Sequence, residues 1–164
     1  MHRILFILLC VVVKLHAVEL FMDQFHGLQK RLVFRVERSI DIQESLLFGV
    51  NVLDGSTKEV GFNMSLWESS YRRYVSETTS AGIFYSFGVR GGMVNLTKVS
   101  ENSEQELCVM PFYDIGIKGQ LSKRWFHVLR LEAGYFMLYS KHINIDHILG
   151  LQFTPFFSFG YSLD

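Results

Sequence analysis

Two carboxylates, Asp114 and Glu132, are the residues whose types and spacing could support general acid–base chemistry. Such chemistry needs an acid and a base that reach the same reacting group. Each carboxylate lies close to a base in the same polar pattern, Lys118 in the first segment and Arg130 in the second. Opposite charges side by side favour ion pairing. The pattern therefore predicts an internal salt-bridge network rather than a catalytic pair.

A second group of reactive types, Ser140, His142 and His147, lies in and beside a polar segment. A serine nucleophile with a histidine base could hydrolyse an ester bond. Histidine in a polar loop is more often a solvated side chain, so we predict no catalytic residue here. No set of His, Cys and Asp has metal-ligand spacing, and Cys108 is the single cysteine after Cys10. We therefore expect neither a metal nor a cofactor.

The elements that carry the two carboxylates are segments of alternating polarity on either side of the polar turn Leu121–Arg124. From Val109 to Ile117 every second residue is mostly apolar, and the same holds from Leu129 to Tyr139. A period of two indicates β-strands rather than helices. A short polar connection between two such strands indicates a hairpin.

Similar alternation predicts five further strands, at 31–40, 45–52, 58–74, 81–97 and 147–164. In the segment 58–74 the expected apolar face consists of Val60, Phe62, Met64 and Leu66, opposite Gly61, Asn63 and Ser65.

The polar faces of these strands indicate which side lies inside. They combine glycine and serine with a few charges of both signs, whereas a soluble sheet carries long solvated side chains there. Small residues and self-neutralising charges suit the inside of a narrow closed barrel, and the continuous apolar face suits hydrocarbon. We therefore predict an all-β fold, a single antiparallel up-and-down β-barrel that is transmembrane. Because bacterial barrels of this kind have an even number of strands, we expect 18–27 to be the eighth.

Two sets of side chains follow from this arrangement. An eight-stranded barrel is wide enough only to be filled by side chains, so the inward charges should pair and close the lumen. The predicted interior polar network is Arg35, Glu37, Arg90, Asp114, Lys118, Arg130 and Glu132. The predicted aromatic rim is Trp67, Tyr71, Tyr74, Trp125 and Tyr139.

Composition and the N-terminal residues place this barrel outside the cytoplasm. Residues 1–17 have a short basic start, an apolar run and a small residue at the expected cleavage point, which predicts a signal peptide followed by one domain, 18–164. The 49% hydrophobic content excludes a disordered chain. Without residues 1–17 the chain has 14 basic and 16 acidic residues, a net charge of −2, which argues against binding nucleic acid.

Several motifs resemble the small bacterial outer-membrane β-barrel proteins of uncharacterised function, in the style of the OmpA and OmpX barrels. The motifs are Gly82–Gly92, Tyr113–Gly116 with Leu121–Trp125, Glu132–Tyr135 and Phe159–Leu163. The resemblance covers most of the chain after the signal peptide and implies placement in the outer membrane of a Gram-negative envelope. It implies no shared active site.

Three functions are compatible with these features. The leading hypothesis is a non-enzymatic, porin-like barrel with a plugged interior and a structural or surface-interaction role. Its partners would be outer-membrane lipid, the barrel assembly machinery and a surface partner at loops 98–106 and 140–146. One alternative is a soluble secreted calycin-like barrel that binds a small apolar ligand in its interior. The other is an outer-membrane hydrolase that modifies lipid, although the His-x-Ser spacing of lipid A deacylases is absent.

Overall fold

The computed structural model describes residues 17–26, 29–56, 60–75, 81–98, 104–139 and 150–163. Side chains are described for 32–55, 61–75, 81–97, 105–138 and 151–163. Nearly all of the predicted signal peptide, residues 1–16, lies outside the described residues, as do Ser140, His142 and His147.

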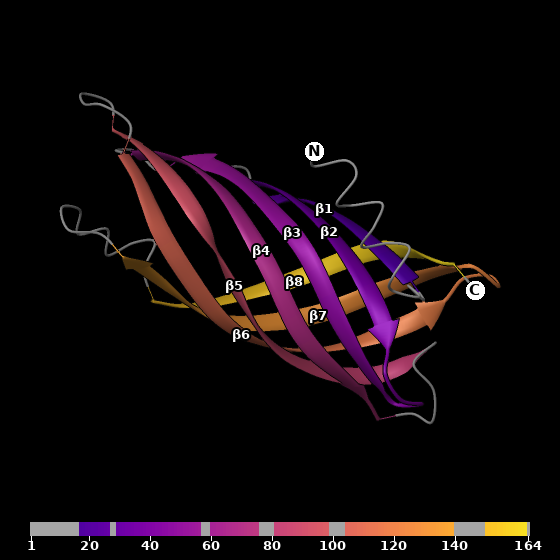
Figure 1. Cartoon of the computed structure of the whole chain (residues 1–164). Coiled ribbons are helices and arrows are strands. Elements are labelled where there is room, and N and C mark those ends of the chain that lie inside the picture. Colours follow the sequence, from indigo (N-terminus) through magenta and orange to yellow (C-terminus); the bar gives the residue numbers. More distant parts are fainter. Residues whose placement is uncertain are drawn as a thin grey trace, which may run out of the picture.

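Within the described residues, eight antiparallel strands follow one another in sequence order and close into a barrel (Figure 1). The predicted all-β, antiparallel up-and-down architecture is confirmed. The strands are β1 (Ala17–His26), β2 (Gln29–Ser39), β3 (Glu44–Ser56), β4 (Val60–Tyr74), β5 (Gly82–Lys98), β6 (Glu104–Gln120), β7 (Trp125–Tyr139) and β8 (Gly150–Ser162).

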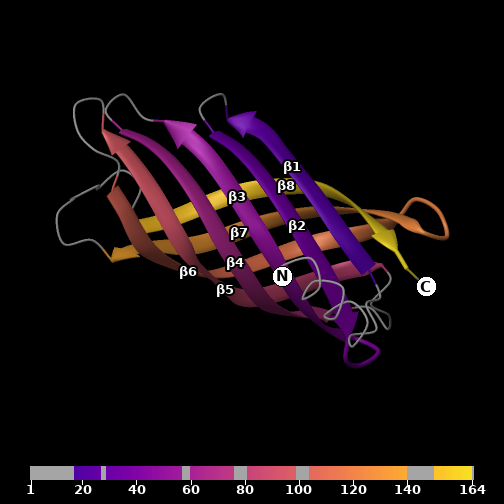
Figure 2. The same cartoon turned by 45° about the horizontal axis from the view of Figure 1, so that its top comes forward.

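The seam that closes the barrel joins β1 to β8. Strand β1 includes 18–26 of the segment 18–27, which was predicted from parity rather than from pattern, and it pairs with β2. In the pairing of β1 with β8, residues Ala17–Leu20 pair with residues Phe159–Ser162. Figure 2 shows the two strands meeting near the C-terminus. Along the described strands this seam is shorter than that between β5 and β6, which extends over Gly82–Leu96.

The two ends of the barrel differ in their connections. We call the end with the β2–β3 and β6–β7 turns the turn end, and the end with the β5–β6 and β7–β8 connections the loop end. At the turn end, the Leu121 amide donates to the Trp125 carbonyl oxygen at 2.8 Å, and the Ile40 amide donates to the Glu44 carbonyl oxygen at 2.9 Å. Both turns occur where alternation of polarity stops in the sequence.

Alternation along the strands sorts side chains between the lumen and the outer wall. In β5, Phe84 and Arg90 are buried, whereas Phe87 and Val89 are exposed. The same rule holds in β6, where Asp114 is buried and Ile115 is exposed. For these strands the structure follows the faces expected from the sequence.

Strand β4 corrects one expectation. Phe62, Met64 and Leu66 are buried in the lumen, and Asn63 and Ser65 are exposed on the outer wall. The prediction from apolarity alone therefore assigned the inner and outer faces of this half of β4 the wrong way round. The physical reason is continuity, because β4 pairs with both neighbours without a register shift.

Parity then fixes the whole of β4. Glu68 and Arg72 are buried toward the turn end of the strand. With a strict period of two, every even position of β4 must face the same side. Their burial therefore places Phe62 and Leu66 in the lumen as well.

The lumen consequently changes character along the barrel axis. Its middle holds charged side chains, and its loop end holds an apolar cluster that we call the loop-end core. This core consists of Phe62, Met64, Leu66, Val94, Leu96, Cys108, Met110 and Phe136, with Leu53 and Leu138 packed against it. A smaller cluster, Tyr74, Phe84, Phe126 and Val128, lies at the turn end.

Inward glycines give the lumen side chains their room. A β-carbon added at Gly92 would lie 2.1 Å from the Ser65 carbonyl oxygen, and one at Gly160 would lie 2.0 Å from the Phe126 ring. At the outward Gly91 the nearest atom, the Cys108 carbonyl oxygen, would be at an ordinary 3.8 Å. Glycine at 92 and 160 on the inner face therefore leaves room for the neighbouring backbone and for Phe126, while the outer face at Gly91 has space for a methyl group.

Candidate functional site: the charged lumen

The candidate site is the set of ionisable side chains in the middle of the barrel. All seven residues of the predicted interior network are buried there. The structure adds Glu68 and Arg72 to them. Among the described side chains, the buried charged groups are thus five bases and four acids.

Glu68 of β4 is the hub of the network. One carboxylate oxygen, Oε2, accepts hydrogen bonds from Arg90 Nε at 2.8 Å, from Arg35 Nη2 at 2.8 Å and from Asn51 Nδ2 at 2.9 Å. Arg35 Nε donates to the other oxygen, Oε1. Hydrogen bonds to charged groups are the strong ones in proteins. Glu68 therefore ties β2, β3, β4 and β5 together from inside.

Arg90 extends the network to the far side of the lumen. Its Nη1 and Nη2 donate to Oε1 and Oε2 of Glu132 on β7, each at 2.5 Å. Arg130 Nη1 lies 3.9 Å from Glu132 Oε2 and donates to Asp114 Oδ2 at 3.0 Å. Acids and bases alternate along this path, so each charge lies beside an opposite one.

A second group of contacts surrounds Glu37 toward the turn end. Glu37 Oε1 accepts from Ser45 Oγ at 2.6 Å and from Tyr74 OH at 2.8 Å. Its Oε2 accepts from Lys118 Nζ at 2.8 Å and lies 3.6 Å from Arg72 Nη1. Four strands again meet at one carboxylate.

Aromatic rings cover the cations that the carboxylates leave open. The Arg90 guanidinium lies 4.0 Å from the centroid of Phe112, and that of Arg72 lies 4.1 Å from Phe84. Lys118 Nζ is 4.3 Å from the centroid of Phe126. Cation–π contacts of this kind gain strength where water is excluded. In this part of the lumen, cations therefore lie beside both carboxylates and aromatic rings.

The two acids that could support acid–base chemistry, Asp114 and Glu132, are both held in ion pairs. Both are buried beside Arg130. Among the described residues, no group of His, Cys, Asp or Glu is placed to hold a metal ion. What the contacts do is cross-link non-adjacent strands through the centre of the barrel.

Sequence reasoning missed the hub of the network. Glu68, Arg72 and Tyr74 were absent from the predicted interior set, although all three are buried. Counting in steps of two from Glu68 through Arg72 to Tyr74 would have placed these three together. The assumption that aromatic and basic residues near a strand end form a rim concealed that signal.

The five residues of the predicted aromatic rim lie in different places. Tyr74 is in the lumen, because its hydroxyl group donates to Glu37, and Trp67 is 74% exposed at the middle of β4. Tyr71 packs on Phe87, with ring centroids 5.2 Å apart. The side chain of the fifth, Tyr139, lies outside the described residues.

Trp125 is exposed at the turn end of the barrel, where β7 begins. Its ring meets Tyr161 edge-on at 5.2 Å between centroids, and the Tyr161 hydroxyl group accepts a hydrogen bond from Arg124 Nη1 at 2.9 Å. Aromatic and basic side chains therefore do combine here, at the turn between β6 and β7.

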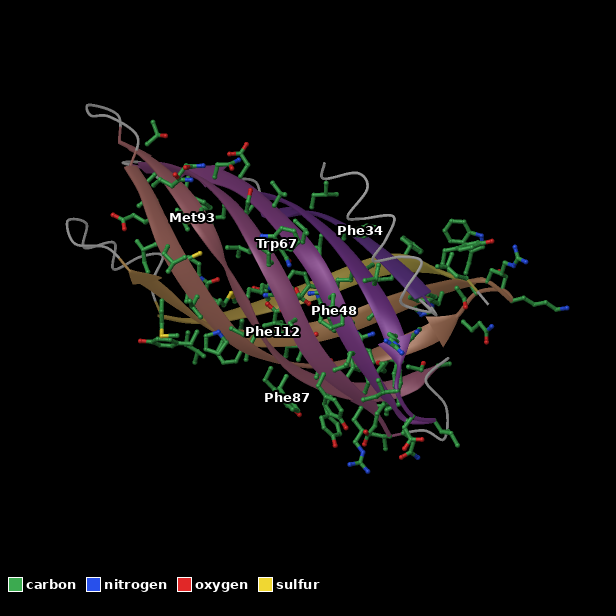
Figure 3. All side chains as sticks on the ribbon, viewed as in Figure 1. Phe34, Phe48, Trp67, Phe87, Met93 and Phe112 are labelled. Carbon is green, nitrogen blue, oxygen red and sulfur yellow. The ribbon has the colours of Figure 1, made fainter. Side chains whose placement is uncertain are left out.

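The outer wall of the described strands β2 to β8 is largely apolar. Exposed large apolar side chains come from every strand whose side chains are described, β2 to β8, and Phe48, Trp67 and Phe87 belong to this wall (Figure 3). In the described part of the chain, outward charged side chains occur near strand ends and in turns, as at Arg38 and Arg73. No helix among the described residues is long and apolar enough to cross a membrane.

Searches of family models, curated proteins and solved structures found no match to this chain.

Proposed function

We propose that this chain is a non-enzymatic β-barrel of the Gram-negative outer membrane, with a plugged interior and a structural or surface-interaction role. The observation that carries the proposal is the distribution of polarity in the middle of the barrel. There the described charges lie in the lumen and the exposed wall is apolar.

Hydrocarbon is the solvent that suits this wall. Soluble monomers rarely expose contiguous apolar patches larger than a few hundred Å². Here apolar side chains such as Ile115, Leu131 and Phe157 are half exposed on neighbouring strands. A lipid-facing surface of a barrel has this composition, and a closed barrel satisfies its own backbone hydrogen bonds in lipid.

The lumen supports a structural role over a conducting one. Glu68, Arg90 and Glu132 span the interior with direct hydrogen bonds. The loop-end core fills the next level of the same lumen. Side chains therefore occupy the path that an open pore would use.

The soluble ligand-binding alternative fits these features poorly. It would place the apolar wall in water, and it would surround an apolar ligand with the charged groups of the middle lumen. Burying a charge beside an apolar ligand is costly unless the charge is paired. The lipid hydrolase alternative depends on Ser140, His142 and His147, which lie outside the described residues.

The test is expression of the full chain in a Gram-negative host, followed by separation of the outer membrane and gel electrophoresis with and without boiling. We expect a band in the outer-membrane fraction whose mobility changes on heating, because a closed barrel resists detergent until it is unfolded. A soluble periplasmic protein with unchanged mobility would refute the proposal. In planar bilayers we expect no steady conductance, and a stable open channel would refute the plugged interior.

A further inference from the structure

The outer wall has one region of opposite character, on the strands β3 to β6 at the loop end. Four residues in register across these strands are polar and exposed. Cross-strand pairing joins Asp54 to Asn63, Asn63 to Asn95, and Asn95 to Gln105. We call these four residues the polar row.

The next register row toward the middle of the barrel is largely apolar. It pairs Val52 with Ser65, Ser65 with Met93, and Met93 with Leu107. Val52, Met93 and Leu107 are all exposed large apolar side chains. The wall therefore changes from apolar to polar within one step of two residues along each strand.

The lumen behind the polar row changes from charged in the middle of the barrel to apolar at the loop end. Met64 directly follows Asn63 in sequence, and Val94 directly precedes Asn95. Both Met64 and Val94 are buried in the loop-end core. At this level the barrel is apolar inside and polar outside, as in a soluble barrel, and in the middle it is charged inside and apolar outside. A single solvent cannot suit both halves, because lipid would leave the amides of the polar row without partners.

From this reversal we infer that the loop end stands beyond the hydrocarbon and that the polar row contacts the saccharide headgroups of a glycolipid leaflet. The inference rests on the proposed membrane placement. The row begins directly after the apolar wall, which is where headgroups follow acyl chains. Its side chains are three amides and one carboxylate, with no base among them. Amides and carboxylates offer donors and acceptors to sugar hydroxyl groups, whereas a phosphate would favour arginine.

The boundary is tested first, by cysteine labelling of the full chain in phospholipid vesicles with a membrane-impermeant maleimide. The variants are Asn95→Cys in the polar row and Val89→Cys in the apolar wall of the same strand. Peptide mapping assigns the label, and Cys108, which is buried, serves as an internal control. We expect Asn95→Cys to react and Val89→Cys to be protected.

Other labelling outcomes separate the two proposals. Protection of both cysteines would mean that hydrocarbon covers the polar row, which overturns this inference and leaves the membrane placement intact. Reaction of both would mean that the wall is in water, which overturns the membrane placement itself.

The saccharide contact is tested with vesicles that do or do not contain digalactosyl diacylglycerol, whose headgroup is uncharged. We expect the glycolipid to raise the temperature at which the wild-type barrel loses its heat-sensitive gel mobility. The double variant Asn63→Ala/Asn95→Ala should lose that rise and should match the wild type in phospholipid alone. An equal rise in both proteins, or no rise in the wild type, would overturn the saccharide contact.

Discussion

Arg90 and Glu132 join two strands that are not neighbours in the sheet. Both terminal nitrogens of Arg90 on β5 donate to the two carboxylate oxygens of Glu132 on β7, while β6 lies between these strands in the wall. The same arginine donates through Nε to Glu68 on β4. This contact adds a side-chain link between two strands that share no backbone hydrogen bonds.

Removing one partner of the Arg90–Glu132 pair should lower the stability of the barrel. We expect Glu132→Leu to lower the free energy of unfolding by about 3–5 kcal/mol, because Arg90 would keep a buried charge with one carboxylate fewer. Urea unfolding from lipid vesicles, followed by tryptophan fluorescence, measures the change. The double variant Arg90→Met/Glu132→Leu should lose less than the sum of the two single variants. Strict additivity would show that the two side chains are not coupled.

The stability of the barrel should depend more on Glu68, the hub of the network, than on Asp114 at its end. Glu68 accepts hydrogen bonds from Arg35, Arg90 and Asn51, whereas Asp114 accepts one from Arg130. We expect Glu68→Gln to reduce the free energy of unfolding more than Asp114→Asn, since each lost charged hydrogen bond is worth about 1.5–3 kcal/mol. The same urea titration compares them. A larger loss for Asp114→Asn would contradict the assignment of Glu68 as the hub.

Adjacent glycines in β5 provide a test of how closely the inner face of this strand approaches the backbone of β4. We expect Gly92→Ala to destabilise the barrel by about 1–3 kcal/mol, because its methyl group would meet the Ser65 carbonyl oxygen at 2.1 Å. Gly91→Ala is the matched control on the outer wall, and it should be neutral or stabilising by about 0.4–1 kcal/mol. Thermal unfolding measured by the change in gel mobility ranks the two variants. Equal effects would show that the inner face is no tighter than the outer one.

Cys108 should report on the integrity of the loop-end core. Its side chain is buried, and Sγ lies 3.5 Å from the Gly92 carbonyl oxygen. We therefore expect Cys108 to resist maleimide in the folded barrel and to react after heating in detergent. Peptide mapping of the labelled protein measures the reaction at this residue. Rapid labelling of the folded protein would place the Cys108 thiol outside the core.

Much of the fold could be predicted because alternation is a local property. The hairpin of β6 and β7 follows from the spacing of residues such as Asp114, Ile115 and Leu131, which need no knowledge of distant strands. The charged lumen could be predicted as well. Arg90 and Asp114 are charged residues in segments of mostly apolar or small residues, and both stand at alternate positions that face inward. These residues are identified by period and charge alone.

The first half of β4 could not be assigned in the same way. Phe62 and Met64 resemble lipid-facing residues, and Asn63 resembles an inward one, because the sequence does not reveal where along a strand the solvent changes. Only the burial of Glu68 on the same parity settles the face. The faces were wrong because the prediction assumed that the whole outer face of β4 contacts the same solvent.

Glu68 was missed for a related reason. It follows Trp67, and an aromatic residue beside charges near a strand end suggested a rim. In the barrel Trp67 lies on the mid-wall and Glu68 behind it in the lumen. The hub receives its donors from β2, β3 and β5, and such long-range convergence has no local signature.

The short seam between β1 and β8 has a consequence for the order of assembly. Ala17 and Ser162 are cross-strand partners, so their pairing brings together strands at opposite ends of the described chain. Every other pairing joins consecutive strands and encloses only a short loop. Since loop-closure entropy increases with the length of chain enclosed, the consecutive hairpins can form first and the ring last. Circularity is then the final event of folding, and until it occurs the unpaired edges of the first and last strands are open to pairing with another chain.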